Sequence, residues 1–179
     1  MRDGFIITYK GRKVCPLALK EEDILFEDIA HALSNKCRFT GHTSKFFSVA
    51  EHSILVAEYA VGFSPIWGLF HDAAEAYLPD IASNIKDEFP LIRITEPIIL
   101  TRIQNKFGLP LLSAQEKAAL KKVDLLVRYW EAKALMPYHP DAEWEKMLLP
   151  GIEVPIRCWT PEQAKMKFIE FGSEFLFSY

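Results

Sequence analysis

Apolar residues recur at helical spacing through most of this chain, and several predicted helices have clear start signals. Three capping boxes occur, in which the first and fourth side chains satisfy backbone amides at a helix start: Ser48-Val-Ala-Glu51, Ser113-Ala-Gln-Glu116 and Thr160-Pro-Glu-Gln163. Ser64-Pro65 is an N-cap followed by proline at the first helical position. The pattern predicts helices over 48–61, 65–78, 113–136 and 160–175, and two more near 27–36 and 94–107.

The first residues follow a different pattern. They predict a short β-hairpin: Phe-Ile-Ile-Thr-Tyr from residue 5, then a Lys-Gly-Arg turn, then Lys-Val up to Val14. Prolines 79, 90, 97 and 110 are expected to break the middle of the chain, and prolines 137 to 155 to mark a loop-rich stretch. Because no repeat or linker occurs, we predict one domain over 1–179, all-α with a short N-terminal hairpin.

Composition narrows the class of protein. The 179 residues are 50% hydrophobic and 25% charged, as in ordinary globular domains. A net charge of −3 argues against a broad nucleic-acid surface, and no apolar run approaches the roughly 20 residues that span a bilayer. The three cysteines are widely spaced and the start lacks a signal-peptide pattern, so we expect a cytoplasmic protein that binds neither nucleic-acid polymers nor membranes.

Ionisable residues interrupt the otherwise apolar segment 66–78. Only His71, Asp72 and Glu75 are polar there, and a helix that is apolar all round is buried. Buried charges are costly unless they are paired or bind a cation. His52 lies on a predicted inward face with leucine, valine and tyrosine, and Asp124 lies between apolar neighbours. The alternative readings are a satisfied core histidine for His52 and a buried salt bridge for Asp124, to Arg128 or a lysine.

Together, two imidazoles and two carboxylates on three helices predict a metal site. This donor set suits divalent Co, Mn, Ni, Fe, Zn or Mg. Four protein ligands leave about two positions of an octahedral shell open for water and substrate, which is typical of catalytic sites.

The ordered set His52, His71-Asp72 and Asp124 resembles that of the HD-domain metal-dependent phosphohydrolases. The resemblance is closest to the 5′-deoxynucleotidase-like branch, and within it to small phage and prophage proteins that include dATP triphosphohydrolases. It runs from about residue 27 to 135 and includes four segments: Asp28-Ile-Ala-His-Ala-Leu-Ser34, Cys37-Arg-Phe-Thr-Gly-His42, Phe46-Phe-Ser-Val-Ala-Glu-His52 and Asp80-Ile-Ala-Ser-Asn-Ile-Lys86.

The resemblance implies an HD-domain helical bundle and a role for each matching residue. The metal ligands would be His52, His71, Asp72 and Asp124. Glu75 and Asp80 would be the catalytic carboxylates. The expected substrate contacts are Arg38 and Lys86 to phosphate, Ser83 by its hydroxyl, Phe39 beside the sugar, where relatives often carry Trp, and His42 at the base or sugar.

The expected activity is metal-dependent hydrolysis of the 5′ phosphate ester of deoxynucleotides. A triphosphate would yield deoxynucleoside and triphosphate, a monophosphate would yield deoxynucleoside and phosphate, and the phage resemblance favours dATP or dAMP. Two other functions stay open: a nucleotide-sensing or scaffold module that has lost turnover, and a phosphodiesterase of another nucleotide. If the protein is phage-encoded, it would act in the host cytoplasm.

The last predicted helix is rich in aromatic residues, with Phe168, Phe171 and Phe175 followed by Phe177 and Tyr179. This is more apolar surface than one small core is expected to cover, so we expect a homo-oligomer, at least a dimer.

Overall fold

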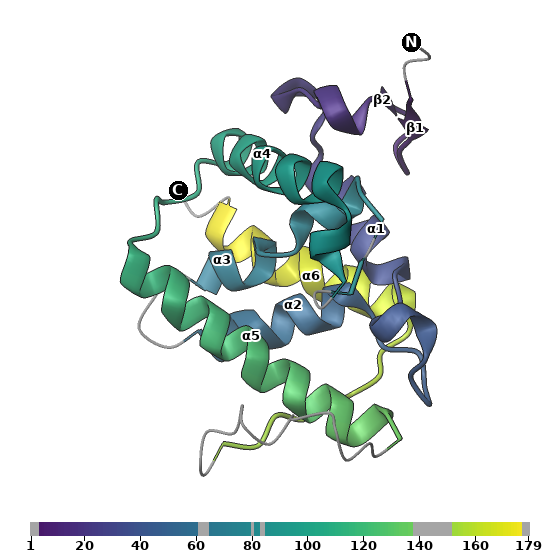
Figure 1. Ribbon diagram of the computed structural model, residues 1–179, viewed down its shortest axis with the longest axis vertical. Coiled ribbons are helices and arrows are strands. Elements are labelled where there is room, and N and C mark those ends of the chain that lie inside the picture. Colours follow the sequence, from purple (N-terminus) through teal and green to yellow (C-terminus); the bar gives the residue numbers. More distant parts are fainter. Residues whose placement is uncertain (1–3, 61–64, 80, 83–84, 138–151, 177–179) are drawn as a thin grey trace.

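The computed structural model describes residues 4–60, 65–79, 81–82, 85–137 and 152–176. These residues are mostly helical, with one small antiparallel sheet at the N-terminal end (Figure 1), as the sequence predicts. The two strands and the α-helices are β1 (Ile6–Ile7), β2 (Lys13–Val14), α1 (Phe26–Asn35), α2 (Val49–Glu58), α3 (Pro65–Phe70), α4 (Pro90–Phe107), α5 (Ala114–Leu135) and α6 (Pro161–Leu176). Short 3-10 helices lie at Pro16–Ala18, Glu21–Asp23, Phe39–Gly41, Ala73–Ala76 and Lys86–Glu88.

Helix α2 lies at the centre of the molecule and contacts α1, α3, α5 and α6 (Figure 1). Every residue from Val49 to Ala57 is buried. One side of α2 joins the main core, which it shares with α1, α3, α4 and α6. Its other side packs through Leu55 and Val56 against Leu126 and Val127 of α5. A polar side chain on α2 is therefore enclosed by protein.

Ser48 caps α2 and accepts a hydrogen bond from the backbone amide of Glu51 at 3.0 Å. The predicted capping box is only half formed, because the Glu51 carboxylate turns away to residues 157–159. It accepts from the backbone amides of Arg157, Cys158 and Trp159 at 2.9, 3.0 and 2.7 Å. Burial raises the pKa of Glu51, against the effect of these amides. This carboxylate therefore fastens the segment before α6 to α2.

Helices α2 and α3 approach each other unusually closely at Gly68. A Cβ atom added there would lie 2.5 Å from the Cα and 2.7 Å from the backbone nitrogen of Ala57. Only glycine leaves room for the two backbones at this distance. The contact matters for the site, since α2 carries His52 and the end of α3 leads into His71.

Two predicted helix boundaries are wrong. The helix from Pro65 ends at Phe70 rather than near Leu78, and a turn at His71-Asp72 leads into the 3-10 helix Ala73–Ala76. The helix expected near 94–107 begins earlier, at Pro90, and Pro97 does not break it but lies inside α4. Pro97 is on the exposed face of α4, where water can solvate the carbonyl group that loses its hydrogen bond.

Helix α6 buries part of its aromatic surface. Phe168 is fully buried in the main core, Phe171 packs against that core, and Phe175 is 44% exposed. Phe177 and Tyr179 lie outside the described residues. Within the described part of the chain, none of the helices is both long and apolar enough to cross a bilayer.

Candidate metal centre

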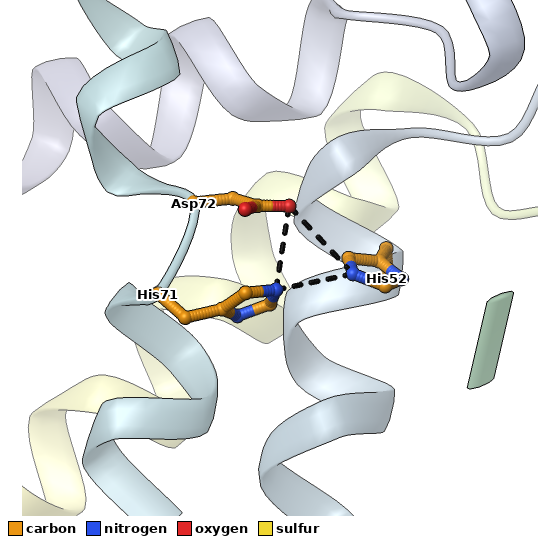
Figure 2. A group of neighbouring side chains, drawn as sticks. All are labelled: His52, His71 and Asp72. Carbon is orange, nitrogen blue, oxygen red and sulfur yellow. Dashed lines mark hydrogen bonds and ion pairs between the residues drawn. The ribbon is translucent and has the colours of Figure 1, made fainter. Parts of the chain in front are cut away.

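Three side chains from two segments converge on one point (Figure 2). The Nε2 atom of His52 lies 3.2 Å from Nε2 of His71 and 3.6 Å from Oδ2 of Asp72. Nε2 of His71 lies 3.3 Å from the same oxygen. His52 is fully buried, while the side chains of His71 and Asp72 keep 11% and 19% of their surface exposed. The group is therefore enclosed on the α2 side and open on the other.

The break after α3 explains how the side chains of the adjacent residues His71 and Asp72 can face the same point. In a continuous α-helix, neighbouring side chains diverge by about 100°. Asp72 instead has φ −102° and ψ 12° as the chain leaves α3. The turn brings both the imidazole of His71 and the carboxylate of Asp72 toward His52 (Figure 2).

Both imidazoles are held with their Nε2 atoms toward the shared point. Nδ1 of His71 donates to the carbonyl oxygen of Gly68 at 2.7 Å, and Nδ1 of His52 donates to Oε1 of Glu131 at 2.6 Å. A carbonyl and a carboxylate only accept, so each Nδ1 carries a proton and Nε2 is the atom through which each ring can bind a metal. This is the arrangement in which histidine binds a metal, with the other ring nitrogen fixed by an acceptor.

Asp124 approaches the same group from α5. Its Oδ1 lies 3.3 Å from Nε2 of His52, and its Oδ2 accepts from Nζ of Lys121 at 2.7 Å. The predicted alternative, a salt bridge to a lysine, is thus also present, but the Lys121 side chain is 60% exposed and such pairs contribute little to stability. The structure brings all four predicted ligands together.

The separations fit a bound cation. A metal with bonds of about 2.1 Å holds neighbouring donor atoms about 3.0–3.4 Å apart in octahedral or tetrahedral geometry. The corresponding separations among His52, His71 and Asp72 are 3.2–3.6 Å, within or slightly above this range. These three residues could therefore hold a metal ion. Asp124 is placed to join them.

Charges in the cluster are arranged to receive a cation. Burial opposes protonation of His71, but the carboxylates of Asp72 and Asp124 outweigh it and raise its pKa to about 9. Burial likewise disfavours ionised Asp72 and Asp124, but the histidines outweigh it and lower the pKa of both carboxyl groups. Two imidazole nitrogens 3.2 Å apart beside two carboxylates need a positive charge between them, either a proton or a metal ion.

Arg38 and Glu131 form a second, buried layer beside the cluster. Nε and Nη2 of Arg38 both donate to Oε2 of Glu131 at 3.2 Å, and Nη1 lies 3.6 Å from Oδ2 of Asp72. Burial disfavours the charge of Arg38, but Glu131, Asp72, Asp124 and Glu75 outweigh it and raise its pKa. Arg38 was expected from the resemblance and Glu131 was not, although Glu131 follows Asp124 by seven residues, two turns along the same face of α5.

The segment after Arg38 is strained. Phe39, Thr40 and Gly41 all have positive φ, at 53°, 54° and 81°. Left-handed conformations are costly for residues other than glycine and are concentrated at functional sites. The Phe39 ring lies beneath the guanidinium group of Arg38, 5.7 Å from its Cζ atom. His42, which closes this turn, is exposed, and its side chain makes no hydrogen bond or ion pair with another described residue.

The remaining predicted residues lie around the open side. Glu75 is buried in the 3-10 helix Ala73–Ala76. Nζ of Lys36 donates hydrogen bonds to the carbonyl oxygens of Glu75 and Leu78 at the end of this helix. Lys86 contacts Oε2 of Glu96 at 2.5 Å. Burial works against the charge of Lys86, but Glu96, Glu75 and Asp72 raise its pKa, so the ammonium group is within electrostatic reach of the site. Asp80 and Ser83 lie outside the described residues.

These features define a mostly helical protein with a buried cluster of histidines and aspartates as a candidate metal centre. No protein-family model matches the chain. It is 36% identical over 132 residues to the uncharacterized protein YfdR of Escherichia coli (strain K12), covering 74% of this chain and 72% of YfdR. It is 35% identical over 136 residues to the uncharacterized protein RCAP_rcc00048 of Rhodobacter capsulatus, covering 70% and 69%. The chain belongs to the family of these two proteins.

Proposed function

We propose that this protein is an HD-domain metal-dependent phosphohydrolase that cleaves the 5′ phosphate ester of deoxynucleotides. The observation that carries the proposal is the cluster of His52, His71 and Asp72, with both histidines held at Nδ1 and a buried arginine alongside. The order of these residues along the chain also supports the proposal, because it resembles the order found in HD-domain enzymes.

The residues suit hydrolysis at phosphorus. When bound, a divalent metal would polarise the phosphoryl group and lower the pKa of a water molecule. Arg38 would neutralise a non-bridging phosphoryl oxygen through Nη1, since its other nitrogens are taken by Glu131. Glu75 would orient the attacking water and accept its proton. Lys86 would approach the phosphate from the open side, with Asp80 and Ser83 in the roles that the resemblance implies.

The arrangement favours attack at the α-phosphorus. Arg38 and the cluster would grip the phosphate nearest the sugar, while Phe39 lies beside Arg38 where a sugar would follow. Water then forms a new bond to the α-phosphorus, the bond from that phosphorus to O5′ breaks, and O5′ leaves with a proton. dAMP would give deoxyadenosine and phosphate, and dATP would give deoxyadenosine and triphosphate.

The reaction is tested by chromatography of dATP, dAMP and ATP after incubation with the protein and Mn²⁺ or Co²⁺. We expect deoxyadenosine with triphosphate or phosphate, and no accumulation of dADP. We also expect slower cleavage of ATP, because Phe39 would crowd a 2′-hydroxyl without offering it a hydrogen bond. Accumulation of dADP would contradict attack at the α-phosphorus, and equal rates on ATP and dATP would contradict the role of Phe39.

Binding without turnover would favour the alternative of a nucleotide-sensing module. The same protein preparation would then bind Mn²⁺ and dATP in calorimetry but release no product. Turnover of a cyclic nucleotide and not of dATP or dAMP would instead favour a phosphodiesterase.

A further inference from the structure

Glu131 lies behind the candidate metal centre and contacts two of its functional residues at once. Its Oε1 accepts from Nδ1 of His52 at 2.6 Å, and its Oε2 accepts from Nε and Nη2 of Arg38 at 3.2 Å each. The side chains of Glu131 and His52 are fully buried, and that of Arg38 is 12% exposed. The carboxylate is therefore inaccessible to a substrate.

Stability alone does not account for a glutamate at this position. Elsewhere along α5, Leu126, Val127 and Leu135 belong to a hydrophobic cluster that includes Leu55 and Val56 of α2. Desolvating an arginine and a glutamate is costly, and apolar replacements of buried ion pairs are often neutral or stabilising. A function that needs both charges at this place is a better account of the pair.

We propose that Glu131 is a positioning residue that fixes the metal ligand His52 and the phosphate-binding Arg38 relative to each other. The role given to Arg38 rests on the proposed function. One oxygen of Glu131 keeps the proton of His52 on Nδ1, so that Nε2 offers its lone pair to the metal. The other oxygen holds one edge of the guanidinium group, so that Nη1 projects toward Asp72 and the anion site.

Only a carboxylate can do both. The donors on its two sides approach different oxygens, and an ionised carboxylate accepts through both oxygens and has no proton of its own to place between them. Glutamine has nearly the same shape but a single accepting oxygen, and its amide nitrogen would face a donor of His52 or Arg38. Glu131→Gln therefore has to release one of the two residues, while it keeps the volume of the side chain.

The test compares metal and phosphate binding in four variants: Glu131→Gln, Arg38→Gln, a double variant that combines Arg38→Gln with Glu131→Leu and so leaves His52 no acceptor, and Glu58→Gln. Glu58 is the matched control, because it pairs with Arg157 at 3.2 Å from the same helix as His52 but outside the site. Co²⁺ affinity is measured by titration of the metal-free proteins. Binding of inorganic phosphate to the Co²⁺-loaded proteins is measured by calorimetry.

We expect Arg38→Gln to weaken phosphate binding at least tenfold while Co²⁺ affinity stays within about threefold of the original chain. Loss of a residue that supports a metal-binding histidine typically lowers metal affinity roughly 10–100-fold. We expect that loss in the double variant relative to Arg38→Gln, where no unpaired arginine is left to disturb folding. Glu131→Gln should weaken the binding of at least one of the two ligands, and Glu58→Gln should weaken the binding of neither.

Equal Co²⁺ affinities for Arg38→Gln and the double variant would overturn the proposal, whatever Glu131→Gln does to the melting temperature. Failure of the proposed function gives a different result. In that case the original chain would not hydrolyse deoxynucleotides, but its Co²⁺ affinity would still depend on Glu131.

Discussion

The two histidines of the cluster are held by acceptors of different kinds. His71 donates to the backbone carbonyl of Gly68, three residues earlier in the chain, so its orientation follows from the end of α3. His52 donates to the side chain of Glu131, 79 residues later in the chain. A single substitution can therefore release His52 while leaving the acceptor of His71 in place. Metal affinity should be most sensitive to side-chain changes on the α2–α5 side.

Removing a ligand and removing a catalytic carboxylate should have different effects. Asp124→Ala takes away a carboxylate 3.3 Å from Nε2 of His52 and should lower metal content and activity together. Glu75→Ala should retain the metal and lose most of the turnover, since a positioned acid–base group contributes about 10²–10⁴-fold. Metal analysis of both purified variants, with rates on dATP, measures the difference.

Lys121→Ala is the control for Asp124. It removes the lysine that pairs with Asp124 and leaves the carboxylate. If Asp124 is held only for that salt bridge, the two variants will behave alike. We expect full metal content in Lys121→Ala. Full metal content in Asp124→Ala as well would exclude Asp124 from the ligand set.

At the scale of single residues, the sequence predicted the four residues of the cluster but not Glu131, which holds His52 in place. His52, His71, Asp72 and Asp124 stand out because each interrupts an apolar pattern on a segment expected to be buried. Glu131 interrupts the same pattern, yet its partners lie 79 and 93 residues away, on α2 and just after α1. Helical spacing says nothing about which residue on another helix faces a given turn, so the link to Arg38 needed the tertiary structure.

The elements of the fold were predictable where capping residues mark their ends. The starts of α5 and α6 follow the capping boxes at Ser113 and Thr160, and both boxes are formed. The turn at His71-Asp72 was not predictable, because residues 66–78 are apolar in a way that suits a buried helix. Tertiary packing overrides that local preference, and the resulting turn is what aligns two neighbouring side chains.

The close contact of α2 with α3 gives a prediction at the scale of elements. In Gly68→Ala the new Cβ would lie 2.5 Å from the backbone of Ala57, so the helices have to separate. Alanine favours a helix by roughly 0.5–1 kcal/mol over glycine, but overpacking typically costs about 1–3 kcal/mol. We expect a lower free energy of unfolding and weaker Co²⁺ binding, because His52 and His71 move apart with their helices. Urea denaturation and metal titration measure these effects.

Gly4→Ala provides the comparison for this variant, since a Cβ there meets no atom within 4 Å. It should change the free energy of unfolding by less than about 0.5 kcal/mol and leave Co²⁺ affinity as it is. If Gly68→Ala matches Gly4→Ala in both measurements, the helix contact does not set the distance between the two histidines.

At the scale of the whole molecule, the exposed apolar residues lie mainly away from α6. Leu91, Ile94 and Ile98 of α4 are 60%, 63% and 48% exposed, and their spacing of three and four residues places them on one face. The aromatic residues of α6 that suggested an oligomer are partly used in the core, where Phe168 is fully buried. The exposed apolar face of α4 is therefore a better candidate than α6 for the surface that an oligomer would cover.

We expect the protein to form a homo-oligomer whose contact includes this face of α4. Ile94→Glu would place a charge in the middle of the apolar stripe, and desolvating that charge in a contact between two copies is costly. Light scattering at micromolar concentration should give at least twice the mass of one chain for the original protein and a smaller mass for Ile94→Glu. Phe175→Glu, at a residue 44% exposed on α6, is the matched variant. A smaller mass for Phe175→Glu alone would move the contact to α6, and a strict monomer before any substitution would end the expectation of an oligomer.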